Sequence, residues 1–145
     1  MQEVELKFQV PPQVRKAVES AVAGPHPARR IRLQAAYFDT PLGALAGAAL
    51  ALRLRKEGRV WVQTLKGTLP DGTGMIRSEH NVPRVEAGPD APAIDPHLHA
   101  GTPVGAALLK VLQQADGELR SVMVTDIWRR VRTTRVPGGW VELAF

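Results

Sequence analysis

The chain of 145 residues contains no cysteine. This absence excludes a disulfide framework, and it excludes any metal or nucleophile site that depends on cysteine. No apolar run approaches the length of a membrane span, and the N-terminus opens on charged residues. We therefore expect neither a transmembrane helix nor a signal peptide, and we expect a soluble protein of the cytoplasm that has no membrane partner.

Aromatic and acidic residues are also scarce. The chain has one Tyr, three Trp and three Phe, and its 14 Asp and Glu face 19 Lys and Arg, which gives a net charge of +5. A basic balance favours an anionic partner, whether nucleic acid, a membrane surface or a small phosphorylated substrate. The length suits one domain, so we expect a single domain over residues 1–145.

Alternating and helical patterns divide the chain into many strands and a few helices. We expect strands at residues 3–10, 30–39, 50–56, 60–66, 75–83, 121–136 and 140–145. We expect helices at 13–23 and 103–115, a short turn or helical loop at 42–50, and loops at 67–74 and 86–103. Pro137-Gly138-Gly139 predicts a hairpin between the last two strands. Together these elements predict an α+β fold built on an antiparallel sheet.

The first expected strand carries charged residues at every second position. Successive side chains of a strand point to opposite faces, so Glu3, Glu5 and Lys7 would form a row on one face, at intervals of roughly 6–7 Å. Two carboxylates at that spacing suit a hard cation such as Mg²⁺ or Mn²⁺, and the lysine suits a phosphate oxygen. The alternative is a half-exposed edge strand with a solvated charged face.

Later strands repeat this alternation, mostly with basic residues. If the sheet curls so that the charged face points inward, the cations would line a channel that attracts a polyanion. The residues on that face are Arg53 and Arg55, then Thr64 and Lys66, then Arg77 and Glu79, and finally Glu142. Each pair alone also fits a solvated strand or a cross-strand ion pair, as do Asp126 and the arginines that follow it.

The same motifs, in order, resemble the CYTH superfamily, the triphosphate tunnel metalloenzymes. They cover the chain from end to end: Glu3-Val-Glu5-Leu-Lys7, Tyr37-Phe-Asp-Thr-Pro41, Leu52-Arg-Leu-Arg55, Gln63-Thr-Leu-Lys66, Arg77-Ser-Glu79, Thr125-Asp-Ile-Trp-Arg129 and Trp140-Val-Glu142-Leu-Ala-Phe145. The stretch from Arg77 to Val82 and the pair Thr125-Asp126 are most similar to the bacterial inorganic triphosphatases.

This resemblance implies an eight-stranded antiparallel tunnel with helices outside, which binds a linear triphosphate beside Mg²⁺ or Mn²⁺. It implies hydrolysis of inorganic triphosphate, or of another polyphosphate, to phosphate and a shorter chain. The implied metal-binding residues are Glu3, Glu5, Glu79 and Glu142. The implied substrate-binding residues are Lys7, Arg53, Arg55, Lys66, Arg77 and Arg129. Lys7, near the scissile end, and Glu5 are the implied catalytic residues.

The chain departs from the family pattern after Phe145. Family members continue with an aspartate and then a last strand that bears another pair of glutamates. We therefore expect that the natural domain is longer than these residues and that its closing strand is missing here. In the triphosphatase branch, a helical CHAD domain often follows. Sheet edges left open in this way would pair with a second copy, which predicts a homodimer.

Two other functions remain open. The same fold hydrolyses thiamine triphosphate or cyclises ATP in other members (class IV adenylyl cyclase), although the few aromatic residues here offer no convincing platform for a base. A non-catalytic module that binds polyphosphate or nucleic acid is the other alternative, with nucleic acid the less expected ligand. His97 and His99 form an H-x-H pair without a third ligand nearby in sequence, which is weak evidence for a metal.

Overall fold

The structure is a computed structural model that describes residues 5–25, 28–70, 72, 74–85, 88 and 90–145. The chain divides into two compact units. The first unit contains Met1–Ile31 and Trp128–Phe145, and the second contains Arg32–Ile127. None of the helices in the described part of the chain is both long enough and apolar enough to span a membrane.

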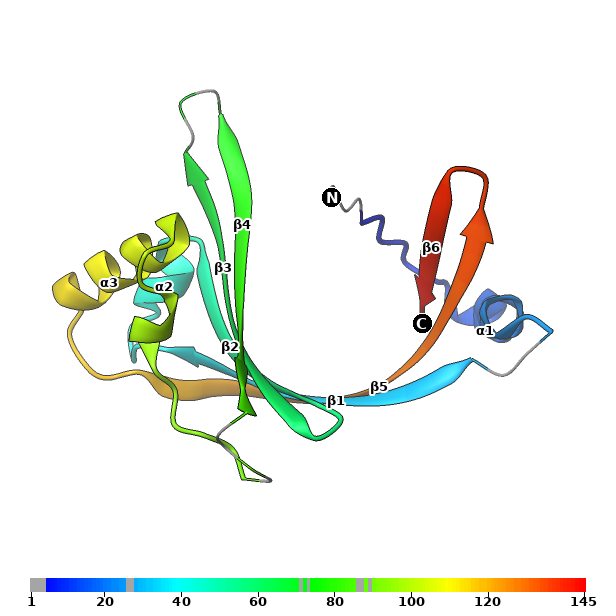
Figure 1. The fold of residues 1–145 in the computed structure, drawn as a ribbon, viewed down its shortest axis with the longest axis horizontal. Coiled ribbons are helices and arrows are strands. Elements are labelled where there is room, and N and C mark those ends of the chain that lie inside the picture. The colour runs from blue at the N-terminus through cyan, green and yellow to red at the C-terminus, as the bar shows by residue number, and fades with distance from the viewer. Residues whose placement is uncertain (1–4, 26–27, 71, 73, 86–87, 89) are drawn as a thin grey trace. The chain divides into compact units, whose positions relative to one another are not determined.

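Six strands form one sheet with the hydrogen-bonded order β4-β3-β2-β1-β5-β6 (Figure 1). The strands are β1 (Arg29–Asp39), β2 (Leu50–Glu57), β3 (Val60–Pro70), β4 (Met75–Arg84), β5 (Arg120–Val136) and β6 (Gly139–Ala144). The helices are α1 (Arg15–Ala23), α2 (Ala44–Gly47) and α3 (Pro103–Gln114), with 3₁₀ turns η1 (Pro12–Val14) and η3 (Pro96–His99). Neighbouring strands run antiparallel in the pairs β1–β2, β2–β3, β3–β4 and β5–β6. The predicted α+β class and antiparallel sheet are confirmed.

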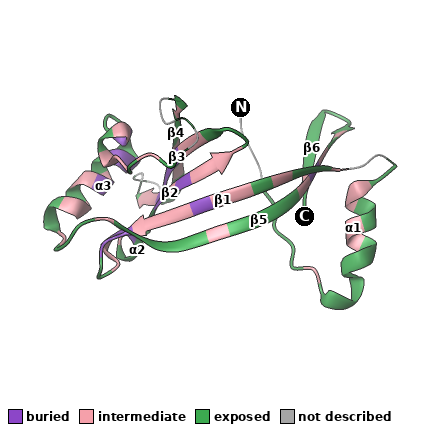
Figure 2. Ribbon diagram, turned by 90° about the horizontal axis from the view of Figure 1, so that it is seen from below, coloured by how far each residue is buried: buried purple, intermediate pink, exposed green. Residues whose placement is uncertain are grey.

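The core of the second unit lies between one face of its sheet and the helices α2 and α3, which cover the same side (Figure 1). The leucines at every second position of β2 are buried, as the leucine pattern predicts (Figure 2). Leu65 of the neighbouring strand β3 and residues of α3 join them in the core. Burying one leucine stabilises the fold by about 1.5–3 kcal/mol, so this cluster contributes several kcal/mol to the stability of the unit. Its buried members are Leu45, Leu50, Leu52, Leu65, Val104 and Leu108.

Asp39 organises the loop that joins β1 to β2. Its carboxylate accepts hydrogen bonds from the backbone N–H groups of Thr40 at 2.7 Å, Leu45 at 2.8 Å and Ala46 at 3.1 Å. The Thr40 hydroxyl accepts a further bond from Ala44 N–H at 3.0 Å. These bonds satisfy the N–H groups at the start of α2, which has no partners for them within the helix. The Tyr37-to-Pro41 motif thus places Leu45 in the core.

The start of α3 is fixed by a cap and by a close backbone contact. Thr102 accepts a hydrogen bond from Gly105 N–H at 3.0 Å, and Pro103 occupies the first turn, where a missing N–H costs nothing. A Cβ atom on Gly105 would lie 1.8 Å from the carbonyl oxygen of His99. Only glycine therefore lets α3 begin against the η3 turn.

In the first unit, α1 packs beside the β5–β6 hairpin. The turn at Gly138 has a φ of 87°, a conformation that glycine adopts without strain, and the register runs from Val136 opposite Gly139 to Val131 opposite Ala144. Glu19 of α1 forms an ion pair with Arg130 of β5. The predicted helix and hairpin are both confirmed.

The strand expected at residues 3–10 is wrong for its described part, because residues 5–11 have no regular structure. Leu6 and Phe8, expected on a buried face, are 74% and 82% exposed. Alternation yields a strand only where a neighbouring strand supplies hydrogen-bond partners, and the described strands include none that pairs with this segment. The loop expected at 67–74 is also too long, since β3 continues to Pro70 opposite Met75.

Candidate functional site

The register of the second unit brings basic side chains from three strands onto one face of the sheet. Directly opposed residues of an antiparallel pair share a face. Arg53 lies opposite Thr64, and Lys66 lies opposite both Ala51 and Glu79. We call the side that carries Arg53, Arg55, Lys66 and Arg77 the cationic face. Leu52 and Leu54 alternate with the two arginines of β2 and point the other way, into the core.

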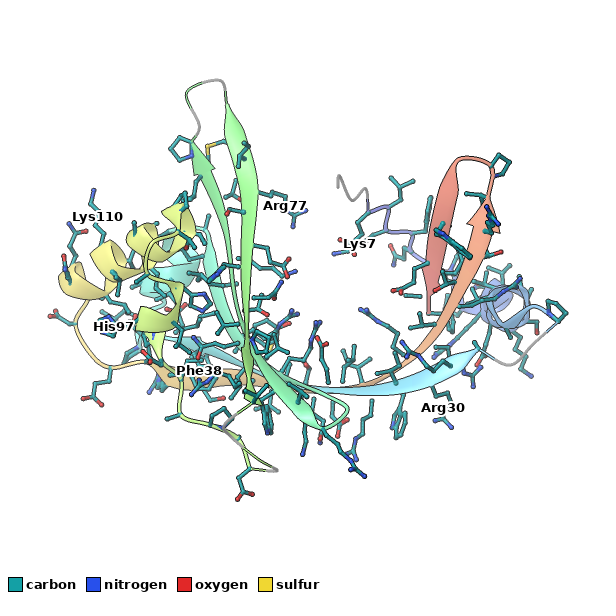
Figure 3. The ribbon with its side chains drawn as sticks, in the orientation of Figure 1. Lys7, Arg30, Phe38, Arg77, His97 and Lys110 are labelled. Carbon is teal, nitrogen blue, oxygen red and sulfur yellow. The ribbon has the colours of Figure 1, made fainter. Side chains whose placement is uncertain are left out.

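The side-chain view agrees with this assignment. Arg77 projects from β4 on the side away from α3, whereas Lys110 lies on the outer surface of that helix (Figure 3). The helices therefore leave the cationic face uncovered by secondary structure of their own unit. Lys110 is a basic residue of the same unit that lies outside this face, which makes it a useful control.

Arg53 and Arg55 each contain a donor that has no hydrogen-bond partner. The Nε atoms of both guanidinium groups are buried and unpaired. The terminal nitrogen of Arg55 forms an ion pair with Glu57, so that guanidinium is already held at one end. A buried N–H without an acceptor costs about 1–3 kcal/mol, and an anion with several acceptor oxygens would recover that cost. Each of the two arginines therefore retains a donor that an anion could satisfy.

Lys66 and Glu79 form the centre of a hydrogen-bonded group on this face. The Lys66 ammonium lies 2.9 Å from Glu79, whose carboxylate also accepts a bond from the Asn81 amide at 3.1 Å. Asn81 in turn accepts a bond from the buried Thr64 hydroxyl at 2.6 Å. The partner of Glu79 is thus on the neighbouring strand, and Asn81 is a member that the sequence motifs did not single out. Asn81 could have been found from the sequence, because a residue two positions after Glu79 in a strand lies on the same face.

These contacts keep Glu79 ionised. Partial burial opposes its negative charge, but hydrogen bonds from Lys66 and Asn81, together with the charge of Arg53, outweigh burial and lower the pKa of the carboxyl. An ionised carboxylate is the ligand that a hard cation prefers, and its hydrogen bonds fix its orientation.

The remaining predicted site residues lie in the other unit. Glu5 and Lys7 form an ion pair at 3.5 Å with both side chains mostly exposed, and Glu3 lies outside the described residues. Glu142 of β6 is opposite Thr133 of β5. Arg130 forms an ion pair with Glu19 of α1. Because adjacent residues of a strand point to opposite faces, Arg129 projects from the other side of β5.

The structure therefore brings together five of the predicted residues in one unit. These are Arg53, Arg55, Lys66, Arg77 and Glu79. The substrate-binding and metal-binding roles of these five residues stay predictions, as do those of Glu3, Glu5, Lys7, Arg129 and Glu142. No three histidine, aspartate or glutamate side chains within the described ranges converge on a point that could hold a metal. The carboxylate oxygens of the predicted set are nevertheless the ligands that Mg²⁺ and Mn²⁺ take in proteins.

Asp126 has a partner that the sequence did not suggest. The guanidinium group of Arg32 meets its carboxylate with two bonds, of 2.8 Å and 2.5 Å, and Gln34 adds a third at 3.4 Å. The hydrogen bonds from Arg32 lower the pKa of the Asp126 carboxyl. Asp126 of the Thr125-Asp126 motif therefore links β5 to β1.

Comparison with known protein families decides the classification. The CYTH domain model matches residues 1–145. The chain belongs to the CYTH family. This membership agrees with the observed α+β antiparallel sheet and confirms the resemblance seen in the sequence motifs. It does not by itself select the inorganic triphosphatase branch.

Solved structures add two CYTH-like neighbours. A candidate adenylyl cyclase of Hippeastrum, described as having a dominant triphosphatase activity, is 18% identical with a TM-score of 0.55, and the match covers 93% of this chain and 68% of that one. A candidate adenylate cyclase of Bacillus halodurans is 17% identical with a TM-score of 0.47, and the match covers 79% of this chain but 57% of that one. The CYTH chain described here thus spans little more than half of the latter. A search of curated proteins found no significant match.

Proposed function

We propose that the protein is a divalent-metal-dependent triphosphatase that hydrolyses inorganic triphosphate to phosphate and diphosphate. The unpaired, buried Nε donors of Arg53 and Arg55 are the observation that carries this proposal. Membership of the CYTH family supports a triphosphate as the substrate class. The triphosphatase activity described for the Hippeastrum protein is the same reaction type.

The residues of the cationic face suit a linear polyanion. Phosphoryl transfer is catalysed largely by positioning and by stabilisation of charge. The planar guanidinium groups of Arg53 and Arg55 would each hold two phosphate oxygens, while Lys66 would act as a point charge. Because these side chains come from two adjacent strands, they would hold successive phosphates of one chain in a fixed orientation.

On the family pattern, the residues assigned to metal binding are Glu3, Glu5, Glu79 and Glu142. A bound Mg²⁺ or Mn²⁺ would neutralise phosphate oxygens and favour deprotonation of an attacking water. The ammonium group of Lys66 lies 2.9 Å from Glu79 and so also neutralises part of the charge of that carboxylate. Lys7 and Arg129 are assigned to phosphate oxygens on the family pattern alone. The homodimer expected from open sheet edges also stays a prediction.

Substitution of Arg53 tests the proposal. Arg53→Ala should raise the KM for triphosphate about tenfold or more, since a hydrogen bond between charged groups contributes about 1.5–3 kcal/mol. Steady-state phosphate release with Mg²⁺ or Mn²⁺ gives the measurement. Arg59→Ala is the matched control, because Arg59 is an exposed arginine outside the cationic face. Equal KM values for the two variants would contradict a substrate-binding role for Arg53.

A substrate panel separates the proposed reaction from its alternatives. Thiamine triphosphate and ATP should be poorer substrates, because Tyr37, opposite Arg53, is the one aromatic residue on the cationic face within the described part of its unit. Phosphate release and cyclic AMP formation should be measured side by side. Cyclic AMP as the main product would replace the proposed reaction with a cyclase. Binding of triphosphate without any turnover in Mg²⁺ or Mn²⁺ would support the non-catalytic module.

A further inference from the structure

A buried polar cluster lies on the helix-covered side of the sheet, behind the cationic face. Gln63 of β3 and His99 of η3 are both fully buried, and His80 of β4 is half-buried. We call these three residues the buried amide–imidazole cluster. Burying a polar side chain costs free energy unless its donors and acceptors form hydrogen bonds, so the hydrogen bonds of these three residues determine whether the fold can accommodate them.

The Gln63 side chain is satisfied at both ends. Its Oε1 accepts bonds from Arg84 at 3.1 Å and from the backbone N–H of Asp95 at 3.0 Å. Its Nε2 donates to the backbone carbonyl of Asp95 at 2.7 Å and lies 3.0 Å from His99 Nε2. Because the Asp95 and Arg84 contacts fix which end is oxygen, the second N–H of Gln63 must donate to His99.

That donation fixes the proton positions on both imidazoles. If His99 Nε2 accepts, then His99 Nδ1 carries the proton, and it donates to His80 Nδ1 at 2.9 Å. The two rings meet edge to face with centroids 5.2 Å apart. A second proton on His99 would be carried by Nε2, and this N–H would then face the N–H of Gln63 Nε2 instead of accepting a bond from it. The cluster is therefore complete only when His99 is neutral.

The surroundings favour that neutral state. Burial and the adjacent His80 lower the pKa of His99 to about 4, and the charge of Asp95 opposes them. Arg84, which is bound to Gln63, and Lys56, which lies over Trp61, are charged groups on this side of the sheet. Arg32 lies on the same side and is paired with Asp126. From α3, apolar Val104 and Leu108 pack in the core nearby, and His97 of η3 is exposed.

The cluster and the cationic face share the same stretches of strand. Gln63 immediately precedes Thr64, and His80 lies between Glu79 and Asn81. Leu65 is opposite His80, and the next opposed pair is Lys66 with Glu79. Each bond of the cluster on one side therefore constrains the backbone that positions a charged side chain on the other side.

We propose that Gln63, His80 and His99 are positioning residues, which hold β3 and β4 in place so that Lys66, Glu79 and Asn81 present a fixed geometry to triphosphate. This inference rests on the proposed function for its substrate, but not for the cluster itself. The η3 turn is in turn held to α3, because the His99 carbonyl accepts a bond from the Thr102 hydroxyl at 2.7 Å. The start of α3 thus supports the site from behind.

Variants of His80 test this inference, because the half-buried ring can be replaced without opening the core. His80→Leu removes the acceptor for His99 Nδ1–H, whereas the side-chain oxygen of His80→Gln can still accept that bond. His97→Leu is the matched control, since His97 is an exposed histidine of the same η3 turn. Two readouts are needed: the KM and kcat for triphosphate, and amide hydrogen exchange at residues 63–66 and 79–82.

We expect His80→Leu to raise the KM about tenfold and to speed exchange at those amides by a similar factor, the result expected for an unsatisfied buried donor. His80→Gln should recover most of both effects, and His97→Leu should show neither. Faster exchange with an unchanged KM would overturn the positioning role, and so would unchanged exchange. A wild-type protein that releases no phosphate would refute the proposed function instead, and the exchange comparison would still decide whether the cluster holds the two strands.

Discussion

Some polar side chains of this CYTH protein are bonded within the fold, whereas others retain an unpaired donor. Asp39 is the acidic residue of the Tyr37-to-Pro41 motif, and its carboxylate is buried and accepts hydrogen bonds from three backbone N–H groups. Arg53, by contrast, retains a buried donor that the fold leaves unpaired. The residues that lack an internal partner are the better candidates for binding a ligand.

Asp39→Ala should lower the free energy of unfolding by about 2–4 kcal/mol, because three N–H groups near α2 lose their shared acceptor. Urea denaturation measures the change. Asp39→Asn keeps one acceptor oxygen and should cost less. Equal stability of wild type and Asp39→Ala would show that the loop does not depend on this carboxylate.

His99 predicts a pH dependence of stability. Its folded pKa, about 4, lies below its ordinary value of 6.5, so the unfolded chain binds the proton more tightly. The contribution of neutral His99 to the free energy of unfolding is fully present above pH 6.5 and falls as the pH drops towards 4. The loss over that window amounts to about 3 kcal/mol.

Urea denaturation between pH 7 and pH 4.5 measures this dependence. His99→Gln should be less stable than wild type at pH 7 but should lose less stability between pH 6.5 and pH 5. His97→Gln should follow the wild-type curve. A His99→Gln curve parallel to that of wild type would assign the dependence to other groups.

At the scale of elements, β3 and β4 each carry residues of the cationic face and residues of the cluster behind it. The Lys66–Glu79 pair joins these strands, but its side chains are 48% and 41% exposed. Exposed ion pairs contribute little to stability, since water screens them and the long side chains lose freedom.

A double-mutant cycle with Lys66→Met and Glu79→Gln should therefore give a coupling free energy below about 1 kcal/mol in urea denaturation. Lys66→Met should nevertheless raise the KM for triphosphate, and Lys110→Met on the outer surface of α3 should not. A coupling above about 2 kcal/mol would show that the pair serves the fold more than the site.

Most elements could be predicted from local patterns, and the failures have a physical cause. The alternation of Leu50, Leu52 and Leu54 predicts β2 because that strand lies between two partners and beneath helices. The equally regular alternation at residues 3–10 fails in its described part, where no neighbouring strand pairs with it. Periodicity gives the faces of a strand but does not supply its partners.

At the scale of the whole molecule, the site was harder to predict than the fold. Arg53, Arg55 and Lys66 could be placed on one face because strand alternation and hairpin pairing are local. The contact between Arg32 and Asp126 joins residues 94 positions apart, and that between Gln63 and His99 joins residues 36 apart. A single sequence carries no signal for such contacts, so the buried cluster was missed.

Removal of divalent cations should stop turnover and leave the fold intact. The core of the second unit is built from leucines and valines, so EDTA should not shift the urea midpoint, whereas phosphate release from triphosphate should cease. Mg²⁺ or Mn²⁺ added in excess should restore it, and EDTA saturated with Mg²⁺ before addition is the control. Phosphate release that persists in EDTA would contradict a metal-dependent reaction.

The middle of β3 leaves no solvent-facing side: Gln63, Thr64 and Leu65 are all fully buried, on alternating faces. Inserting one residue ahead of them would exchange the faces, turning Lys66 towards α3 and Leu65 towards the arginines. The number of residues in this strand is therefore constrained by the cationic side chains on one face and by core packing on the other.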